Sequence, residues 1–169
     1  FITTRRVDHF IAHSSHMLNF LRRVKWVSKN KITLVNNAID TSNINNVYIK
    51  LKAERRPKNK YGIVFISRLI PGKKIDRLIE AFASVSKIYP ESILSIIGEG
   101  PFKINLEEMV RGLNIENKVK FLGGIYDDRI LAEHLYRNSI FVLPGVGGLS
   151  FNTAMAAGLP IIHTYADGT

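Results

Sequence analysis

The sequence contains no cysteine, which excludes disulfide bonds and thiolate chemistry. It also lacks any apolar run near the roughly 18–20 residues that a membrane-spanning helix needs. Acidic residues are scarce: 14 Asp and Glu stand against 24 Lys and Arg, so the formal net charge is +10. A surface of this sign attracts phosphates, whether in nucleotides, nucleic acids or anionic lipid head groups.

The rest of the composition is that of a soluble globular protein. Hydrophobic residues make up 46% and charged residues 22%, and 169 residues suffice to bury one good core or slightly more. The first six residues, beginning at Phe1, do not have the pattern of a signal peptide.

From Tyr61 onward, short apolar segments alternate with segments whose apolar residues recur at helical spacing. The expected strands lie at 61–67, 92–97, 118–124, 139–143 and 160–164, and the expected helices at 75–89, 102–113, 127–137 and 150–157. This alternation predicts an α/β fold, a Rossmann-like parallel sheet with right-handed crossovers and helices on both faces. In such sheets ligands bind at the carboxyl ends of the strands.

The first 60 residues are less regular. Two short strands are expected at 8–14 and 31–35, and Ser14 or Ser15 can cap a helix between them. Residues 48–60 carry six basic side chains, which favours a solvated linker over a patch for a membrane surface or a partner. We therefore expect a short N-terminal part over 1–47, a basic linker over 48–60 and the main domain over 61–169.

Two strand ends carry residues suited to a phosphorylated ligand. After the first strand of the main domain, Arg68 offers a planar guanidinium for bidentate phosphate contact, and Lys73 offers a mobile charge. Gly98 and Gly100 follow the second strand, where they permit positive φ and close approach of the backbone. The alternatives are two solvated surface charges and a tight strand-to-helix turn.

A third strand end, PGVGGLS at 144–150, is the richest in glycine. Amides at the start of a helix near Ser150 lack intrahelical partners and lie in positive macrodipole potential. The loop is therefore predicted to cradle a pyrophosphate with its backbone. It fits neither G-x-x-x-x-G-K-[ST] nor G-x-G-x-x-G, which removes the main support for an ATPase or an NAD-dependent dehydrogenase.

The order of these motifs resembles the retaining, nucleotide-sugar-dependent GT-B glycosyltransferases of family 4, also called group 1. The resemblance covers nearly all of 61–169 and rests on FISRL (65–69) with Lys73, IGEGP (97–101), VKFLG (119–123) and TAMAAGLPII (153–162). It implies that the chain is a piece of a longer enzyme. Residues 1–47 would end its N-terminal, acceptor-binding domain, and 61–169 would form its C-terminal nucleotide-sugar-binding domain, truncated at the C-terminus.

The resemblance also implies roles for single residues. Arg68 and Lys73, the expected catalytic residues, would neutralise the donor diphosphate and stabilise the leaving nucleotide. Amides of the glycine-rich loop would hold the same phosphates, and backbone near Gly123 and Pro144 would lie against the base. The expected donor-binding set is Gly98, Gly100, Gly123, Ile125, Pro144, Gly147, Gly148, Leu149, Ser150 and Thr153.

One departure concerns two glutamates of the family, eight positions apart, which correspond here to Gly145 and Thr153. In the family the first contacts the sugar and the second holds the ribose hydroxyls, for which Thr153 offers one hydroxyl. We favour a variant branch with a PG-x-x-GLS loop over a degenerate site that binds without turnover, because both phosphate-binding cations remain.

Two histidines are further candidates. His163 follows the last strand and is a candidate for the sugar side, with a packed strand-end residue as the alternative. His13 ends a strand of the N-terminal part, where enzymes of this class bring acceptor-side residues toward the donor. No cofactor and no metal are expected, since the family usually works without a bound metal and Asp127-Asp128 is too thin a pair to indicate one.

The implied activity is transfer of a glycosyl group from a nucleotide-diphosphate sugar to a glycan or lipid-linked acceptor, in bacterial polysaccharide or lipopolysaccharide biosynthesis. Because such active sites form between two domains, this piece is expected to be inactive alone. It is expected to be cytoplasmic and peripheral on the inner face of the membrane, where anionic lipid is a candidate partner. Nucleic acid is not expected, since no motif for it is present. The alternatives are a non-catalytic nucleotide- or nucleic-acid-binding module and a sugar-nucleotide epimerase.

Overall fold

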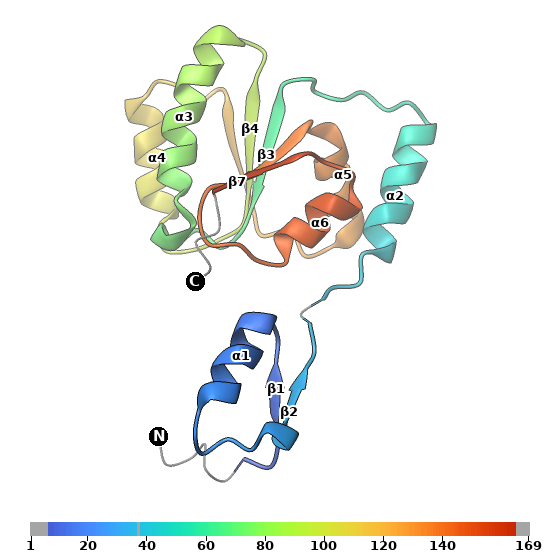
Figure 1. Ribbon diagram of the computed structural model, residues 1–169. Coiled ribbons are helices and arrows are strands. Elements are labelled where there is room, and N and C mark those ends of the chain that lie inside the picture. The colour runs from blue at the N-terminus through green and yellow to red at the C-terminus, as the bar shows by residue number, and fades with distance from the viewer. Residues whose placement is uncertain (1–6, 37, 165–169) are drawn as a thin grey trace. The chain divides into compact units, whose positions relative to one another are not determined.

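Two compact units make up the chain in the computed structural model, which describes residues 7–36 and 38–164 (Figure 1). The first unit ends at Ala38 and the second begins at Ile39. The elements of the first unit are β1 (Phe10–Ala12), α1 (Ser15–Arg23), the 3₁₀ turn η2 (Lys29–Lys31) and β2 (Ile32–Leu34). Those of the second are α2 (Ser42–Ala53), β3 (Gly62–Ile66), the 3₁₀ turn η3 (Pro71–Lys73), α3 (Ile75–Ile88), β4 (Ile93–Ile97), α4 (Lys103–Gly112), β5 (Val119–Gly123), α5 (Asp128–Arg137), β6 (Ile140–Leu143), α6 (Ser150–Ala156) and β7 (Ile161–His163).

The second unit is built on five parallel strands in the order β5-β4-β3-β6-β7. The first of these strands in the chain, β3, lies at the centre, with β4 on one side and β6 on the other. Helices α3 and α4 lie on one face of the sheet, and α5, α6 and α2 lie on the other (Figure 1). The predicted Rossmann-like α/β fold is therefore confirmed.

Apolar β-branched sequences explain the central strands. β3 reads GIVFI and β4 reads ILSII, as expected for strands with helices on both faces. Helix α3 turns Ile75, Leu78, Ile79 and Phe82 toward the sheet, one face of a 3.6-residue period, and all four are buried. Burying side chains of this size stabilises the fold by about 1.5–3 kcal/mol each.

Side-chain caps set the start of two helices where the sequence offers them. The Ser14 hydroxyl accepts a hydrogen bond from the Met17 amide at 3.2 Å, which confirms the predicted cap of α1. Asp127 caps α5 by accepting from the amides of Arg129 at 2.8 Å and Ile130 at 3.2 Å. The carboxylate of Asp127 is thus engaged by the backbone.

The segment predicted as a basic linker begins inside a helix, so the linker prediction is wrong for residues 48–53. Helix α2 packs on α5, with Ile44 buried in the core and the Tyr48 and Tyr136 rings 5.4 Å apart. The helix belongs to the second unit, so the boundary at Ala38 also precedes the expected one at 47/48. Apolar residues at i, i+3, i+4 and i+7 form the packed stripe, whose signal is masked in the composition by the lysines on the outer face.

The first unit is a small pairing of two strands and one helix. β1 and β2 run parallel, with Phe10 opposite Ile32. Ala12 and Val27 are its buried apolar residues, and the Phe10 and Trp26 rings lie 6.1 Å apart. The strands expected at 8–14 and 31–35 are both present, though each is only three residues long.

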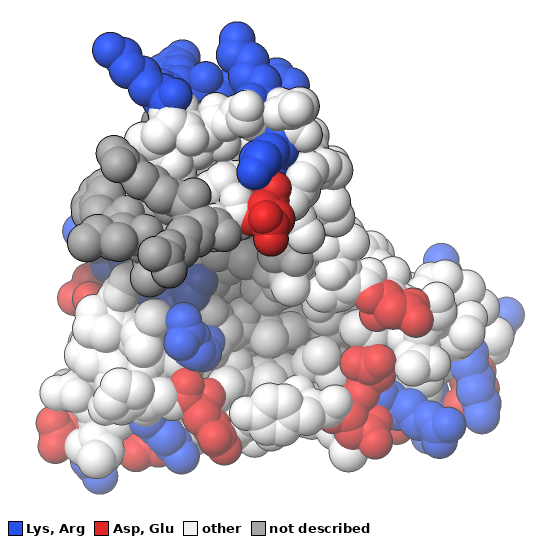
Figure 2. Space-filling view, turned by 90° about the horizontal axis from the view of Figure 1, so that it is seen from below, with Lys and Arg blue, Asp and Glu red and all other residues white. Residues whose placement is uncertain are grey.

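Charge is unevenly distributed on the surface. Figure 2 shows Lys and Arg side chains gathered without acidic neighbours in one place, and side chains of both signs together elsewhere on the face drawn. None of the helices in the described ranges has the length and apolar character to cross a membrane.

Candidate functional site

The loops after β3 and β6 meet at one edge of the sheet. The two strands are neighbours, but the chain continues from β3 to β4 on one side and from β6 to β7 on the other. Such a switch point leaves a crevice at the carboxyl ends of the strands, where open α/β sheets bind ligands. We refer to Arg68, Lys73 and the loop 144–150 as the carboxyl-end site.

Lys73 connects the two loops. Its ammonium donates hydrogen bonds to the carbonyl oxygens of Val146 at 2.6 Å and Gly147 at 3.2 Å. Partial burial lowers the pKa of Lys73 below its usual value, and the positive charge of Arg68 lowers it further. The structure therefore brings the two predicted cations close enough for their charges to interact, with Arg68 exposed at the surface.

Gly145 lies directly beneath the loop that carries Lys73. A Cβ at Gly145 would lie 2.5 Å from the Cα and carbonyl carbon of Lys73 and would collide with the carbonyl oxygen of Gly72. The amide of Val146 donates to that same oxygen at 3.3 Å. The position that corresponds to the first glutamate of the family is thus filled by backbone, and no side chain fits there.

Four successive amides of the glycine-rich loop make no hydrogen bond to the described backbone. Among the described residues, the amides of Gly147, Gly148, Leu149 and Ser150 have no hydrogen-bond acceptor. The amides that follow are engaged, for example Phe151 with the carbonyl of Gly148 at 3.2 Å. The loop predicted to cradle phosphate therefore offers a run of unpaired donors beside Lys73.

Gly98 and Gly100 act through close packing of backbone. Gly98 has φ of 139°, and a Cβ there would collide with the carbonyl oxygen of Ser67. A Cβ at Gly100 would lie 2.7 Å from the carbonyl carbon of Leu69. Both glycines thus let the turn after β4 press against the residues on either side of Arg68, which fixes the segment that carries the guanidinium.

Glu99 is a residue that the sequence analysis did not single out. Its carboxylate accepts a hydrogen bond from the Gly124 amide at 3.3 Å, and its carbonyl accepts from the Leu69 amide at 2.8 Å. Gly123, with φ of 71°, accepts from the Gly98 amide at 2.7 Å. Glu99 therefore ties together the loops after β3, β4 and β5. The signal that could have found it is an acid held between two glycines at a strand end.

The other predicted site residues differ in their exposure and in the contacts that they make. Pro144 and Ile125 are half-buried at the ends of their loops, and Ile125 packs on the core. Thr153 is only 7% exposed, and its hydroxyl donates to the carbonyl of Leu149 at 3.4 Å, so it must turn before it can reach a ligand. His163 ends β7 with its ring 5.3 Å from that of Phe151. His13 is exposed after β1 in the first unit.

The part of the chain covered by the structure contains no cluster of three or more histidine, aspartate or glutamate side chains arranged to hold a metal ion. Of the residues that define the carboxyl-end site, Arg68 and Lys73 carry the positive charges. The arrangement can therefore bind a diphosphate through two cations and a row of amides.

Comparison with known proteins gives the family. The family model of glycosyl transferases group 1 matches residues 49–169. A GDP-mannose-dependent phosphatidylinositol monomannoside mannosyltransferase of Mycobacterium tuberculosis is 31% identical over 131 residues, which cover 69% of this chain and 34% of that protein. An alpha-monoglucosyldiacylglycerol synthase of Acholeplasma laidlawii is 31% identical over 122 residues, covering 65% of this chain and 30% of that protein.

A solved structure shows the same fold over nearly the whole chain. The Anabaena protein HepE in complex with UDP and glucose matches with a TM-score of 0.75 and 21% identity, covering 99% of this chain and 47% of that one. The present chain spans about a third of the length of the curated relatives named above. The family match over residues 49–169 includes every strand of the sheet and both loops of the carboxyl-end site. The chain therefore belongs to the group 1 glycosyl transferases.

Proposed function

We propose that the second unit is the donor-binding half of a glycosyltransferase, which moves a sugar from a nucleotide-diphosphate donor to a glycan or lipid-linked acceptor. The observation that carries this proposal is the meeting of Arg68, Lys73 and the unpaired amides of 147–150 at the switch point of the sheet. Cations and amides converging on one place suit a diphosphate. The UDP and glucose bound to HepE, and the GDP-mannose in the mannosyltransferase's name, support a nucleotide sugar as the ligand.

The proposed chemistry follows from the charges. Breaking the bond between the anomeric carbon and the terminal phosphate oxygen leaves an oxocarbenium-like sugar and places the electron pair on the nucleotide. The acceptor hydroxyl oxygen bonds to the anomeric carbon, and its proton passes to the released phosphate. Arg68 and Lys73 stabilise this developing negative charge, which makes them the proposed catalytic residues. To do so, the Lys73 ammonium exchanges the carbonyls of Val146 and Gly147 for phosphate oxygens. We propose no metal, because these side chains supply the positive charge.

The packing of Gly145 supports an intact variant of the family. The backbone of Gly72 and Lys73 occupies the space of a side chain at this position, and the Val146 amide bonds to Gly72. If this position had only lost a glutamate side chain, the space beside Gly145 would be open rather than filled by the backbone of Gly72 and Lys73. We propose that Thr153 of α6 contributes its hydroxyl after turning from the Leu149 carbonyl, and that His163, which ends β7, contacts the sugar.

The acceptor is proposed from the relatives and from charge. The names of both relatives specify lipid acceptors or lipid products: a phosphatidylinositol mannoside and a glucosyldiacylglycerol. The formal charge of +10 favours contact with an anionic membrane surface, and we propose a peripheral position on its cytoplasmic face. His13, in the first unit, remains the candidate on the acceptor side.

Calorimetry with UDP, GDP, ADP and their sugar conjugates tests the proposal. We expect one nucleotide diphosphate to bind the wild type and to bind Arg68→Ala/Lys73→Ala at least a hundredfold more weakly. At about a hundred times its Kd, that nucleotide should raise the free energy of unfolding by roughly 2.7 kcal/mol. Lys87→Ala/Arg111→Ala is the matched control, since both side chains are exposed on α3 and α4. Binding that survives the first pair, or is lost equally in the control, contradicts the proposal.

A further inference from the structure

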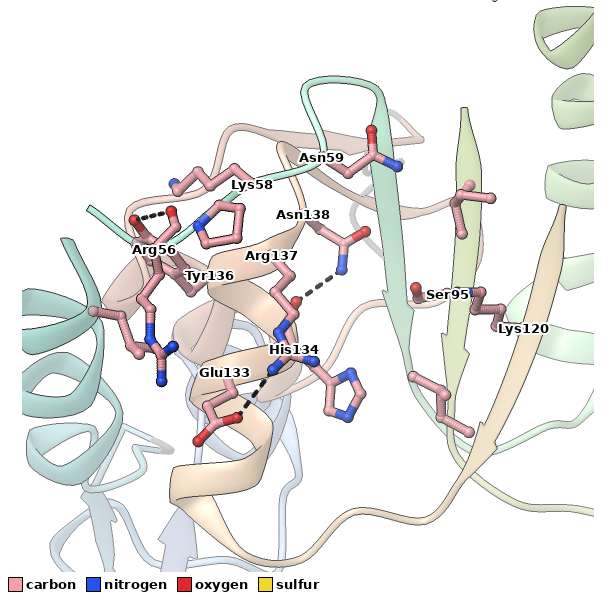
Figure 3. A pocket seen from close by; sticks show the side chains of 14 residues that line it. Arg56, Lys58, Asn59, Ser95, Lys120, Glu133, His134, Tyr136, Arg137 and Asn138 are labelled. Atoms are coloured by element: carbon pink, nitrogen blue, oxygen red, sulfur yellow. Dashed lines mark hydrogen bonds and ion pairs between the residues drawn. The ribbon is translucent and has the colours of Figure 1, made fainter. Parts of the chain in front are cut away.

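A second pocket, of about 560 Å³, lies between α5 and the sheet, away from the carboxyl-end site (Figure 3). Its lining includes Asn59 just before β3, Ile93 at the first position of β4, and Asn138 just before β6. These residues mark the amino ends of three strands, whereas Arg68 and Pro144 follow the carboxyl ends. We call this cavity the amino-end pocket. Its volume is within the range of roughly 300–1,000 Å³ that small-molecule sites occupy.

Polar side chains interrupt the sheet on the wall of this pocket. Ser95 of β4 and Lys120 of β5 are partners in the strand register, so both point toward α5, and both line the pocket. Strands with helices on both faces are normally apolar throughout. The buried serine, which is 7% exposed, and the exposed lysine therefore give this wall of the pocket a polar character.

Basic side chains from three segments line the pocket, and one of them, the Lys58 ammonium, donates to the Tyr48 hydroxyl of α2 at 3.1 Å. Arg56 and Lys58 come from the segment before β3, Lys120 comes from the sheet, and Arg137 comes from α5. The one acid of the lining, Glu133, is paired with Arg137 at 3.5 Å, and Arg56 is paired outside the lining with Glu54 at 3.3 Å. Both pairs are exposed to solvent, and pairs of this kind hold their partners weakly. Among the described residues, Lys120 has no ion pair.

The lining is also held in place by neutral contacts. Asn138 donates to the carbonyl of His134 at 2.7 Å, and the Tyr136 hydroxyl donates to the carbonyl of Arg56 at 3.0 Å. The Lys58 ammonium lies 4.5 Å from the centre of the Tyr136 ring. His134 and Asn138 point from α5 toward the strands (Figure 3). These contacts hold the α5 side of the pocket in place.

The pKa of a histidine in the pocket is lowered mainly by burial. The pKa of His134 is held below its usual value, first by burial and then by the positive charge of Arg137, which outweighs the opposite effect of Glu133.

We propose that the amino-end pocket is a second binding site, specific for a phosphorylated small molecule and separate from the donor. The Arg137 guanidinium can hold phosphate in a bidentate manner, Lys120 adds a point charge, and Ser95 and Asn59 offer neutral hydrogen bonds. A pocket of this volume admits a molecule the size of a sugar phosphate. A polymer would instead need an open track of charge.

Pyrophosphate titrated into Arg68→Ala/Lys73→Ala provides the test, because this variant removes the cations of the carboxyl-end site. We expect calorimetry to show saturable binding of one pyrophosphate, weakened at least tenfold when Lys120→Gln/Arg137→Gln is added. The matched control adds Lys87→Gln/Arg111→Gln, one exposed lysine and one exposed arginine on the helices of the opposite face. Thermal unfolding of each variant establishes that the fold is retained.

The proposal is overturned if pyrophosphate fails to saturate the first variant, or if the control substitutions weaken binding as much as the pocket substitutions. A basic oligonucleotide-binding surface would show the reverse pattern, with oligonucleotide bound and pyrophosphate not. Failure of the donor proposal is separate, because it appears as loss of nucleotide binding by the wild type while pyrophosphate still binds the double variant.

Discussion

The two ends of the sheet present positive charge in different ways. At the carboxyl ends, the charge is set among glycines, and the donors beside it are backbone amides. At the amino ends, the cations come from a strand, a helix and a loop, and their neighbours are side chains such as Tyr136 and Ser95. Adding a side chain to a closely packed backbone site should destabilise the fold. Replacing a side chain in the amino-end pocket should leave the fold stable but weaken ligand binding. The two ends should therefore respond to substitution in opposite ways.

The largest expected effect is on stability at the carboxyl-end loops. Gly98→Ala combines an unfavourable φ with a collision against Ser67, and should lower the free energy of unfolding by about 3 kcal/mol. Gly145→Ala, which meets the backbone of Lys73, should cost about 1–3 kcal/mol. Urea unfolding measures both. Gly112→Ala is the control, since nothing lies within 4 Å of its added Cβ, and equal losses in all three variants would refute the comparison.

Next in size is the loss of nucleotide affinity on removing one cation. Lys73→Met keeps the length of the side chain but removes the charge that we assign to the diphosphate. A hydrogen bond to a charged group contributes about 1.5–3 kcal/mol, so the Kd measured by calorimetry should rise roughly ten- to hundredfold. Lys73→Arg, which keeps the charge, should restore part of the affinity. An unchanged Kd for Lys73→Met would remove this residue from the donor site.

A smaller effect separates stability from binding at the amino-end pocket. Lys120→Leu places an apolar residue on a strand beside Leu122, so the free energy of unfolding should change by no more than about 0.5 kcal/mol. Pyrophosphate affinity of the Arg68→Ala/Lys73→Ala protein should nevertheless fall. A large loss of stability would instead show that Lys120 is needed for folding.

The smallest expected effect is the pH dependence that His134 produces. Its pKa is lowered in the folded state from an ordinary value of 6.5, so the unfolded chain binds more protons between the lowered pKa and 6.5. Stability should therefore rise with pH through this window and become level above it. The difference between wild type and His134→Gln, measured by urea unfolding from pH 5 to 7.5, should show this slope. A slope of opposite sign would indicate a net negative field around the pocket.

Sequence periodicity predicted most of the second unit. The apolar segments of β3 and β4 and the 3.6-residue spacing in α3 placed these elements within about two residues, because burial dictates their pattern locally. Helix α2 was missed because its apolar stripe against α5 is interleaved with lysines. Composition averages over both faces of a helix, so the lysines of the solvent-exposed face hid the apolar residues of the packed face.

The sequence predicted which residues form the carboxyl-end site, but it did not predict the contacts between them. Arg68 and Lys73 were expected together, and their positions at a strand end were enough for that. The hydrogen bonds from Lys73 to the carbonyls of Val146 and Gly147 depend on two loops some 70 residues apart, which no local pattern encodes. The amino-end pocket had one available signal, a lysine inside an otherwise apolar strand, but the meaning of Lys120 depends on its register with Ser95.

The anchoring of Lys73 also affects how readily a ligand can be captured. A free lysine loses up to about 2 kcal/mol of rotamer freedom when it is fixed in place. In this chain the side chain is already held across the two loops by two carbonyls, so that freedom is lost as the protein folds. An arriving diphosphate then meets an ammonium that is already held at the site, and its oxygens replace the two carbonyls as acceptors.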